Sequence, residues 1–354
     1  MNGEFHRARW SSGVWVMAVA LCLAALWAAV FPLGTGPLPV TGPYAVAHAL
    51  ATLTDAYRLE TYGSAGGHRR VTVGVWYPSG EPGTQASDHP LVVFSHGALG
   101  VLDSNESLYR ELASHGYVVA SIGHTYQALY VVEDPGGRTW IDAGYLRDLR
   151  REDAKVDRRA SFELYRQWMA VRTADIEFVI ESLIGVTPTA SALSEARELV
   201  DGTRIGLMGH SLGGSAALGV GRLRAEVTAK VAAVVALESP LLTDIVGVEL
   251  GEFVIDPSPY PVPVLNVYSD DTWGRLTEMP QYAGNVALLE SPHDDVINVH
   301  IEGSRHLGLT DLSLTSPLLT RLLGGTRQVA DAKEVLRAVS SLTLEFLDTH
   351  LRGF

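Results

Sequence analysis

Short apolar runs alternate with helix-like patterns along most of the chain, and this order predicts a layered α/β fold. Apolar runs typical of parallel strands covered on both faces occur at residues 91–94, 117–122, 205–208, 231–237, 262–268 and 296–301. Residues 71–78 alternate as a half-buried strand does, and helical patterns occupy residues 106–115, 168–183, 190–199 and 335–351. Because a strand, a helix and a strand in this order require a right-handed crossover, we expect a mostly parallel central sheet with helices on both faces.

The N-terminal region carries an apolar segment without a charge, residues 14–31, at the lower limit of a membrane span. Basic residues lie before this segment, and no Lys or Arg follows it until Arg58. The positive-inside rule then predicts a cytoplasmic N-terminus (residues 1–13), a transmembrane helix and an extracytoplasmic domain. The nearest small-residue cleavage pattern, Ala45-Val46-Ala47, lies well beyond the apolar segment, so we expect an uncleaved anchor. The alternative is a cleaved signal segment, which would give a secreted protein. Residues 32–43, rich in Pro and Gly, predict a linker to a domain at 44–354.

Composition narrows the classes of function. The chain has 354 residues, of which 47% are hydrophobic and 19% charged, as in a globular protein. Its net charge of −13 and the absence of a basic stripe argue against a nucleic-acid partner. The single cysteine, Cys22, lies in the N-terminal segment, so the domain has neither a disulfide nor thiol chemistry. Metal-ligand spacings such as H-E-x-x-H do not occur, and we expect no metal or organic cofactor.

The strand at 205–208 runs directly into Gly209-His210-Ser211-Leu212-Gly213, and a helix of small residues begins near Ser215. A G-x-S-x-G sequence between a strand and a helix is typical of the nucleophile elbow of the α/β-hydrolase fold. The serine occupies a strained corner, and the glycines leave room for the turn. The following helix directs its free N–H groups toward the oxyanion that forms when serine attacks a carbonyl. We therefore predict an α/β-hydrolase fold with Ser211 as nucleophile.

A second loop completes the predicted oxyanion hole. The strand at 91–94 ends in Ser95-His96-Gly97-Ala98-Leu99-Gly100, the position where this fold supplies one donor from the backbone. We assign the two N–H donors to Ala98 and Leu212, and we expect His96 to shape the loop instead of acting as a base. Residues 124–166 are charged and aromatic, which predicts either a small insertion over the site or a solvated helix.

A serine hydroxyl needs a neighbouring base, and histidine has a suitable pKa. The chain order of this fold places the base after Ser211, which leaves His293, His300, His306 and His350. His350 ends the closing helix, His300 alternates within a strand, and His293 lies in a turn before that strand. Only His306 follows the final strand in a glycine-containing loop, so we predict that His306 is the base.

The acid of the triad orients the base, and a carboxylate of either type at a strand end can do this. Glu238 ends the strand at 231–237, and Asp270 follows the strand at 262–268. The usual placement in the fold favours Asp270, but the residues alone leave both open.

A set of segments resembles the plasma and intracellular type II platelet-activating factor acetylhydrolases and their bacterial relatives. The similarity extends over about residues 41–315 and is carried by Thr41-Gly42-Pro43-Tyr44, Val75-Trp76-Tyr77-Pro78, Phe94-Ser95-His96-Gly97, Gly209-His210-Ser211-Leu212-Gly213-Gly214, Ala236-Leu237-Glu238 and Ile301-Glu302-Gly303-Ser304-Arg305-His306. In that family the acid ends an Ala-Leu-Asp segment after the nucleophile unit. The resemblance therefore favours Glu238 over Asp270, with Glu in place of the usual Asp.

These inferences predict a serine ester hydrolase that forms an acyl-enzyme, with Ser211, His306 and Glu238 as its triad. The resemblance implies short-acyl or oxidised phospholipids as substrates, and the predicted anchor would make the membrane a partner. The alternatives are a general carboxylesterase or polyester hydrolase, similar to dienelactone-hydrolase-like and cutinase-like proteins, and a catalytically silent hydrolase scaffold that only binds.

Overall fold

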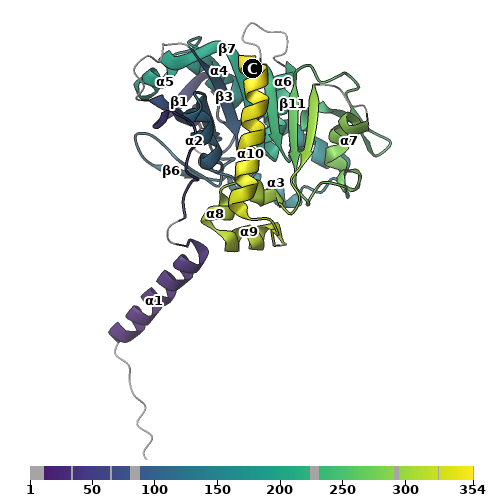
Figure 1. Cartoon of the computed structure of the whole chain (residues 1–354). Helices are drawn as coiled ribbons and strands as arrows, with labels where there is room; N and C mark the ends of the chain where they lie inside the picture. The colour runs from purple at the N-terminus through teal and green to yellow at the C-terminus, as the bar shows by residue number, and fades with distance from the viewer. Residues whose placement is uncertain are drawn as a thin grey trace, which may run out of the picture.

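The computed structural model describes residues 12–32, 35–63, 66–79, 88–223, 231–290, 295–325 and 327–353. A central sheet lies between helices (Figure 1). The sheet has eight strands in the order β1-β2-β4-β3-β7-β8-β11-β12. The strands are β1 (Ala45–Leu59), β2 (His68–Ser79), β3 (His89–Ser95), β4 (Val118–Gly123), β7 (Val200–His210), β8 (Val231–Leu237), β11 (Val264–Tyr268) and β12 (Val296–His300). Only the β1–β2 and β2–β4 pairs of this sheet are antiparallel, so the prediction of a mostly parallel sheet is confirmed.

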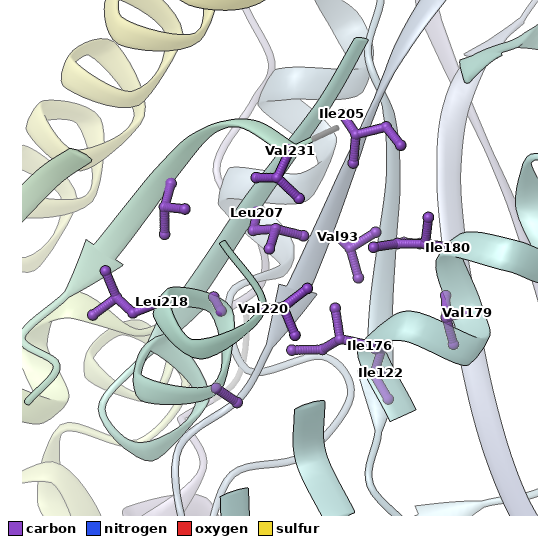
Figure 2. Packing of buried hydrophobic residues seen from close by; sticks show 14 of the residues in the cluster. Val93, Ile122, Ile176, Val179, Ile180, Ile205, Leu207, Leu218, Val220 and Val231 are labelled. Atoms are coloured by element: carbon purple, nitrogen blue, oxygen red, sulfur yellow. The ribbon is translucent and has the colours of Figure 1, made fainter. Parts of the chain in front are cut away.

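Helices cover both faces of the sheet, and alternate side chains of each strand supply the two cores. On one face, Val93 and Leu207 pack with apolar residues of α4 (Arg158–Leu183) and α6 (Leu212–Leu223). Figure 2 shows this packing, with Ile176 and Ile180 of α4 directed toward the strands. On the other face, the neighbouring strand residues pack against α2 (Glu106–Ser114) and α10 (Ala332–Leu347). Every residue of β3 and β4 is buried, which accounts for the mostly apolar sequences of these two strands.

The predicted transmembrane helix is wrong. The apolar segment forms α1 (Ser12–Val30), drawn at the lower left of Figure 1. In the part of the chain that the structure describes, no helix is long and apolar enough to cross a membrane. The helix ends before Phe31, so its apolar part, residues 14–30, spans about 26 Å at 1.5 Å per residue, whereas the hydrocarbon layer is about 30 Å thick.

The longest strand, β1, was not predicted. Its 15 residues pair with β2 in antiparallel register from Ala45 opposite Ser79 onward. As an edge strand it is half-exposed over most of its length and mixes small and polar residues with apolar ones, so no continuous apolar run marks it. The Ala45-Val46-Ala47 pattern, noted above as a cleavage signal, lies at the start of this strand.

Shorter elements lie around the sheet. Residues 124–166 contain the hairpin β5 (Tyr130–Val132) and β6 (Arg138–Trp140), then α3 (Ala143–Arg151) and the first turns of α4. A second hairpin comprises β9 (Ile245–Glu249) and β10 (Glu252–Ile255). The remaining α-helices are α5 (Ser194–Leu199), α7 (Ala283–Glu290), α8 (Leu312–Thr315) and α9 (Pro317–Gly324).

Candidate active site

Ser211 lies between the end of β7 and the start of α6, at the sharp turn that the G-x-S-x-G sequence predicts. Its φ angle is +54°, in the left-handed region that a serine rarely adopts. The Ser211 N–H donates to the carbonyl oxygen of Leu237 at the end of β8, which fixes this corner to the neighbouring strand (2.9 Å). Gly209 cannot carry a side chain, because a Cβ there would lie 2.4 Å from the backbone of Gly213. The close approach of strand and helix thus accounts for the glycines of the motif.

His306 begins the 3₁₀-helix His306–Leu309, in the loop that follows β12. The backbone N–H of His306 donates to Asp271 Oδ2 (2.8 Å), and Arg305 donates to the other oxygen of the same carboxylate (2.8 Å). His210, next to Ser211 in the chain, donates from Nε2 to the carbonyl oxygen of His306 (2.9 Å). The two imidazole rings also pack together, with their centroids 4.5 Å apart. These contacts hold the loop of His306 against the elbow that carries Ser211.

Glu238, in the loop immediately after β8, is the carboxylate that contacts His306. Its Oε2 lies 3.2 Å from His306 Nδ1, and its side chain is completely buried. The other oxygen, Oε1, accepts hydrogen bonds from the hydroxyls of Ser269 (2.8 Å) and Thr272 (2.5 Å). Glu238 also has a positive φ of +49°, so its side chain leaves the strand end in an unusual direction. The carboxylate is therefore held in one orientation, with one oxygen toward the imidazole.

The electrostatics of this pair suit a base and its orienting acid. Burial opposes the charged form of both groups, but their mutual hydrogen bond and charge outweigh it. As a result the pKa of His306 is raised and the pKa of Glu238 is lowered. Burial, together with the nearby His306, lowers the pKa of His210 to about 3, so His210 is neutral near pH 7. Glu238 thus stabilises an imidazolium at His306, and His210 does not compete for the proton.

Asp270, the other candidate acid, contacts a different histidine. Its Oδ1 lies 2.8 Å from His300 Nε2, and its carboxylate also accepts the backbone N–H of Gly303 (3.1 and 3.2 Å). Trp273 stacks on the His300 ring at a centroid distance of 5.4 Å. His350 packs against Phe346 of α10, and His293 lies outside the described residues.

The predicted oxyanion loop lies directly beside the nucleophile. A Cβ built on Gly97 would be 3.0 Å from His210 Nδ1 and 3.5 Å from Ser211 Cβ. The carbonyl oxygen of Gly97 accepts hydrogen bonds from His96 Nδ1 (2.7 Å) and from the backbone N–H of Gly100 (3.1 Å). His96 is completely buried, and burial holds its pKa well below its usual value. It therefore acts within the loop as a neutral hydrogen-bond donor, which agrees with the loop-shaping role expected from the sequence.

The two assigned oxyanion donors are the backbone N–H groups of Ala98, in the loop after β3, and of Leu212, at the start of α6. Leu212 is the first residue of α6, so its N–H has no acceptor within the helix. A trans peptide directs its C=O and N–H to opposite sides, so the N–H of Ala98 points away from the donors that bind the Gly97 carbonyl oxygen. No cluster of three or more potential metal-ligating side chains occurs in the described parts of the chain.

A buried polar network beneath the oxyanion loop was not predicted. Ser95 Oγ lies 2.8 Å from His124 Nε2, and His124 Nδ1 lies 2.9 Å from Asp175 Oδ2, with all three side chains completely buried. Arg172 of α4 reaches the same loop. No sequence pattern marks this network, because Arg172 and Asp175 occupy a helix whose apolar periodicity dominates the pattern.

Comparison with known proteins shows which family this chain resembles in sequence. The sequence model of the family described as "Platelet-activating factor acetylhydrolase, isoform II" matches residues 79–353. The platelet-activating factor acetylhydrolase of Bos taurus is 21% identical over 283 residues, which cover 74% of this chain and 57% of the relative. The protein of the same name from Canis lupus familiaris is 22% identical over 278 residues, with the same coverage. The chain thus spans a little over half the length of these relatives.

Among solved structures, a ferulic acid esterase from Streptomyces cinnamoneus superimposes with a TM-score of 0.62 at 21% sequence identity, covering 91% of this chain and 94% of its own. At this identity the likeness establishes a shared fold. The match of the family model over most of the chain establishes more: this chain belongs to the platelet-activating factor acetylhydrolase isoform II family.

Proposed function

We propose that this protein is a serine carboxylic ester hydrolase in which Ser211 is the nucleophile, His306 the base and Glu238 the acid. The observation that carries the proposal is the contact between Glu238 and His306, in a loop that His210 holds against the nucleophile elbow. The family and the fold support the same class of reaction.

In the proposed reaction, the imidazole of His306 takes the proton of Ser211 as its hydroxyl oxygen attacks the acyl carbonyl carbon. The N–H groups of Ala98 and Leu212 donate to the oxyanion of the tetrahedral intermediate. When that intermediate collapses, His306 returns the proton to the leaving alkoxide and Ser211 keeps the acyl group. Water, deprotonated by His306, then attacks the acyl-enzyme and releases the acid. Glu238 stabilises the imidazolium in both steps.

We further propose short-acyl or oxidised phospholipid esters as the substrate class. The basis is the family, whose relatives carry the name platelet-activating factor acetylhydrolase. A general carboxylesterase would use the same triad, so the substrate class needs its own test.

The first experiment measures hydrolysis of p-nitrophenyl esters, from acetate to palmitate, by the full chain, together with labelling by a fluorophosphonate. We expect turnover of short esters and labelling of the wild type, and neither in Ser211→Ala. Ser215→Ala is the matched control, because Ser215 is a buried serine one turn further along α6 that hydrogen-bonds to the Ser211 carbonyl (3.3 Å). Labelling that persists in Ser211→Ala, or a wild type that neither hydrolyses nor reacts, would contradict the proposed nucleophile.

A second experiment addresses the substrate class. Phosphatidylcholines with an acetyl or a palmitoyl chain at the sn-2 position are compared at equal concentration, with p-nitrophenyl acetate as reference. We expect the acetyl phospholipid to be hydrolysed with the higher kcat/KM. Hydrolysis of the simple ester without hydrolysis of either phospholipid would favour the general carboxylesterase.

A further inference from the structure

Arg172 lies in the middle of α4, and its side chain is completely buried. Its Nη1 donates to the carbonyl oxygen of His96 at 2.6 Å, and its Nη2 lies 3.5 Å from the carbonyl oxygen of Gly97. Its Nε donates to Gln127 Oε1 at 2.9 Å, which fixes the plane of the guanidinium group. Burying a charge is costly, so a buried guanidinium directed at two consecutive carbonyls of one loop calls for a physical explanation.

The contacts determine how the peptides of the oxyanion loop are oriented. Arg172 Nη2, His96 Nδ1 and the backbone N–H of Gly100 all approach the Gly97 carbonyl oxygen. Since C=O and N–H lie on opposite sides of a trans peptide, these donors hold the N–H of Ala98 on the other side. Rotation of this peptide would remove the donor from the oxyanion.

Close packing against α6 limits movement of the oxyanion loop toward that helix. A Cβ built on Gly213, in the first turn of α6, would lie 2.0 Å from the carbonyl oxygen of Ser95 and 2.5 Å from that of His96. The loop backbone therefore touches α6 directly, and the His96 carbonyl oxygen contacts both this turn and Arg172. The hydrogen bond from Arg172 to the His96 carbonyl oxygen opposes movement of the loop away from α6. Without the guanidinium group, the loop would lose this contact.

The buried network beneath the loop supports Arg172 itself. Nη1 lies 3.5 Å from Ser95 Oγ, which in turn contacts His124 and, through it, Asp175. Burial lowers the pKa of His124 to about 4, so the ring is neutral near pH 7. A neutral ring that donates from Nδ1 to Asp175 accepts the Ser95 hydroxyl proton at Nε2, which leaves the Ser95 oxygen free to accept from Arg172.

We infer that Arg172 is a positioning residue for ester hydrolysis, which orients the Gly97–Ala98 peptide so that the Ala98 N–H meets the oxyanion. The inference rests on the proposed function, because it concerns the oxyanion hole of that reaction. In this role Arg172 contacts neither the substrate nor the reacting atoms. It acts through the backbone of the loop.

The test compares Arg172→Met and Arg172→Lys with wild type in the full chain, using p-nitrophenyl acetate. Fluorophosphonate titration gives the concentration of competent sites, and kcat is expressed per titrated site. Arg222→Met is the matched control, because Arg222 is a largely buried arginine of α6 that pairs with Asp244 and contacts no residue of the oxyanion loop in the described structure. Thermal unfolding of each variant reports stability separately.

We expect Arg172→Met to lower kcat per site by about 10- to 100-fold with KM within about threefold, since loss of one oxyanion donor costs about 10²- to 10³-fold. Lysine keeps the charge but not the planar fork that spans several acceptors, so Arg172→Lys is expected to lose about tenfold in kcat. A trifluoromethyl ketone that mimics the oxyanion should bind more weakly in proportion to kcat, whereas the product alcohol should bind as it does to wild type.

A purely structural role would lower the unfolding temperature and the titrated fraction but would leave kcat per site unchanged, and that result would overturn the inference. If Arg172→Met does not fold, Arg172→Lys becomes the test variant. A wild-type kcat together with a wild-type ketone affinity in Arg172→Lys would also overturn the inference. A wild type without esterase activity would instead refute the proposed function, and this inference with it.

Discussion

Replacing Glu238 by glutamine tests the proposed triad at the residue that contacts the base. The change keeps the size of the side chain and removes its charge. The glutamine carbonyl oxygen can still accept from the Ser269 and Thr272 hydroxyls, so its amide nitrogen would face His306 Nδ1. An N–H at this place favours the tautomer with its proton on Nε2, which cannot accept the proton of Ser211.

The magnitude follows from the geometry of the pair. A unit positive charge on His306 and a unit negative charge on Glu238 at 3.2 Å attract each other by about 5 kcal/mol at an effective dielectric constant of about 20. The His306 side chain is 32% exposed, so solvent screening reduces this value. We expect kcat to fall by about 10³-fold, or about 4 kcal/mol, since each tenfold change in rate corresponds to about 1.4 kcal/mol.

The assay is kcat for p-nitrophenyl acetate, with circular dichroism to show that the variant is folded. Asp270→Asn is the control, because Asp270 contacts His300 and Gly303 instead of His306. We expect this control to lose less than about tenfold. A Glu238→Gln variant within tenfold of wild type, or an Asp270→Asn variant that loses more than Glu238→Gln, would refute the assignment of the acid.

Three further predictions concern the pH dependence of catalysis and the stability of the fold. The raised pKa of His306 predicts that kcat/KM increases with pH through a midpoint above 6.5, and that this midpoint is lower in Glu238→Gln. The pH profile is measured between pH 5 and 9. A wild-type midpoint at or below 6.5 would contradict this prediction. Gly213→Ala would place a Cβ 2.0 Å from a carbonyl oxygen of β3, so the free energy of unfolding, measured with urea, should decrease by roughly 3 kcal/mol or more. Gly324 has open space around it, so Gly324→Ala should leave the free energy of unfolding nearly unchanged. Burial raises the pKa of Asp311 to about 7, so the folded state keeps a proton that the unfolded state has lost, and the free energy of unfolding should decrease from about pH 4 to pH 7. Asp311→Asn should remove this part of the pH dependence, and equal slopes in the two proteins would show that another group is responsible.

The layered fold and the nucleophile elbow could be predicted because their determinants are local. A parallel strand that is buried on both faces, such as β3, carries a continuous apolar run (residues 91–94), and the turn at Ser211 requires glycine at position 209. The edge strand β1 has neither property, since most of its residues are half-buried or exposed, and it was missed. The segment of α1 shows the opposite error: its apolar composition suggested a membrane span, although the helix ends before the apolar run does.

By itself, the sequence determined where a strained turn can form and which histidine follows the last strand, because backbone freedom and periodicity are recorded in neighbouring residues. Only the tertiary structure decided which carboxylate contacts His306. Glu238 and Asp270 both follow strand ends, and their different partners depend on the left-handed backbone of Glu238 and on the loops after β11 and β12. The same holds for Arg172, whose contacts with the oxyanion loop join residues 75 or more positions apart. Such pairings are set by the packing of distant elements, and no local pattern records them.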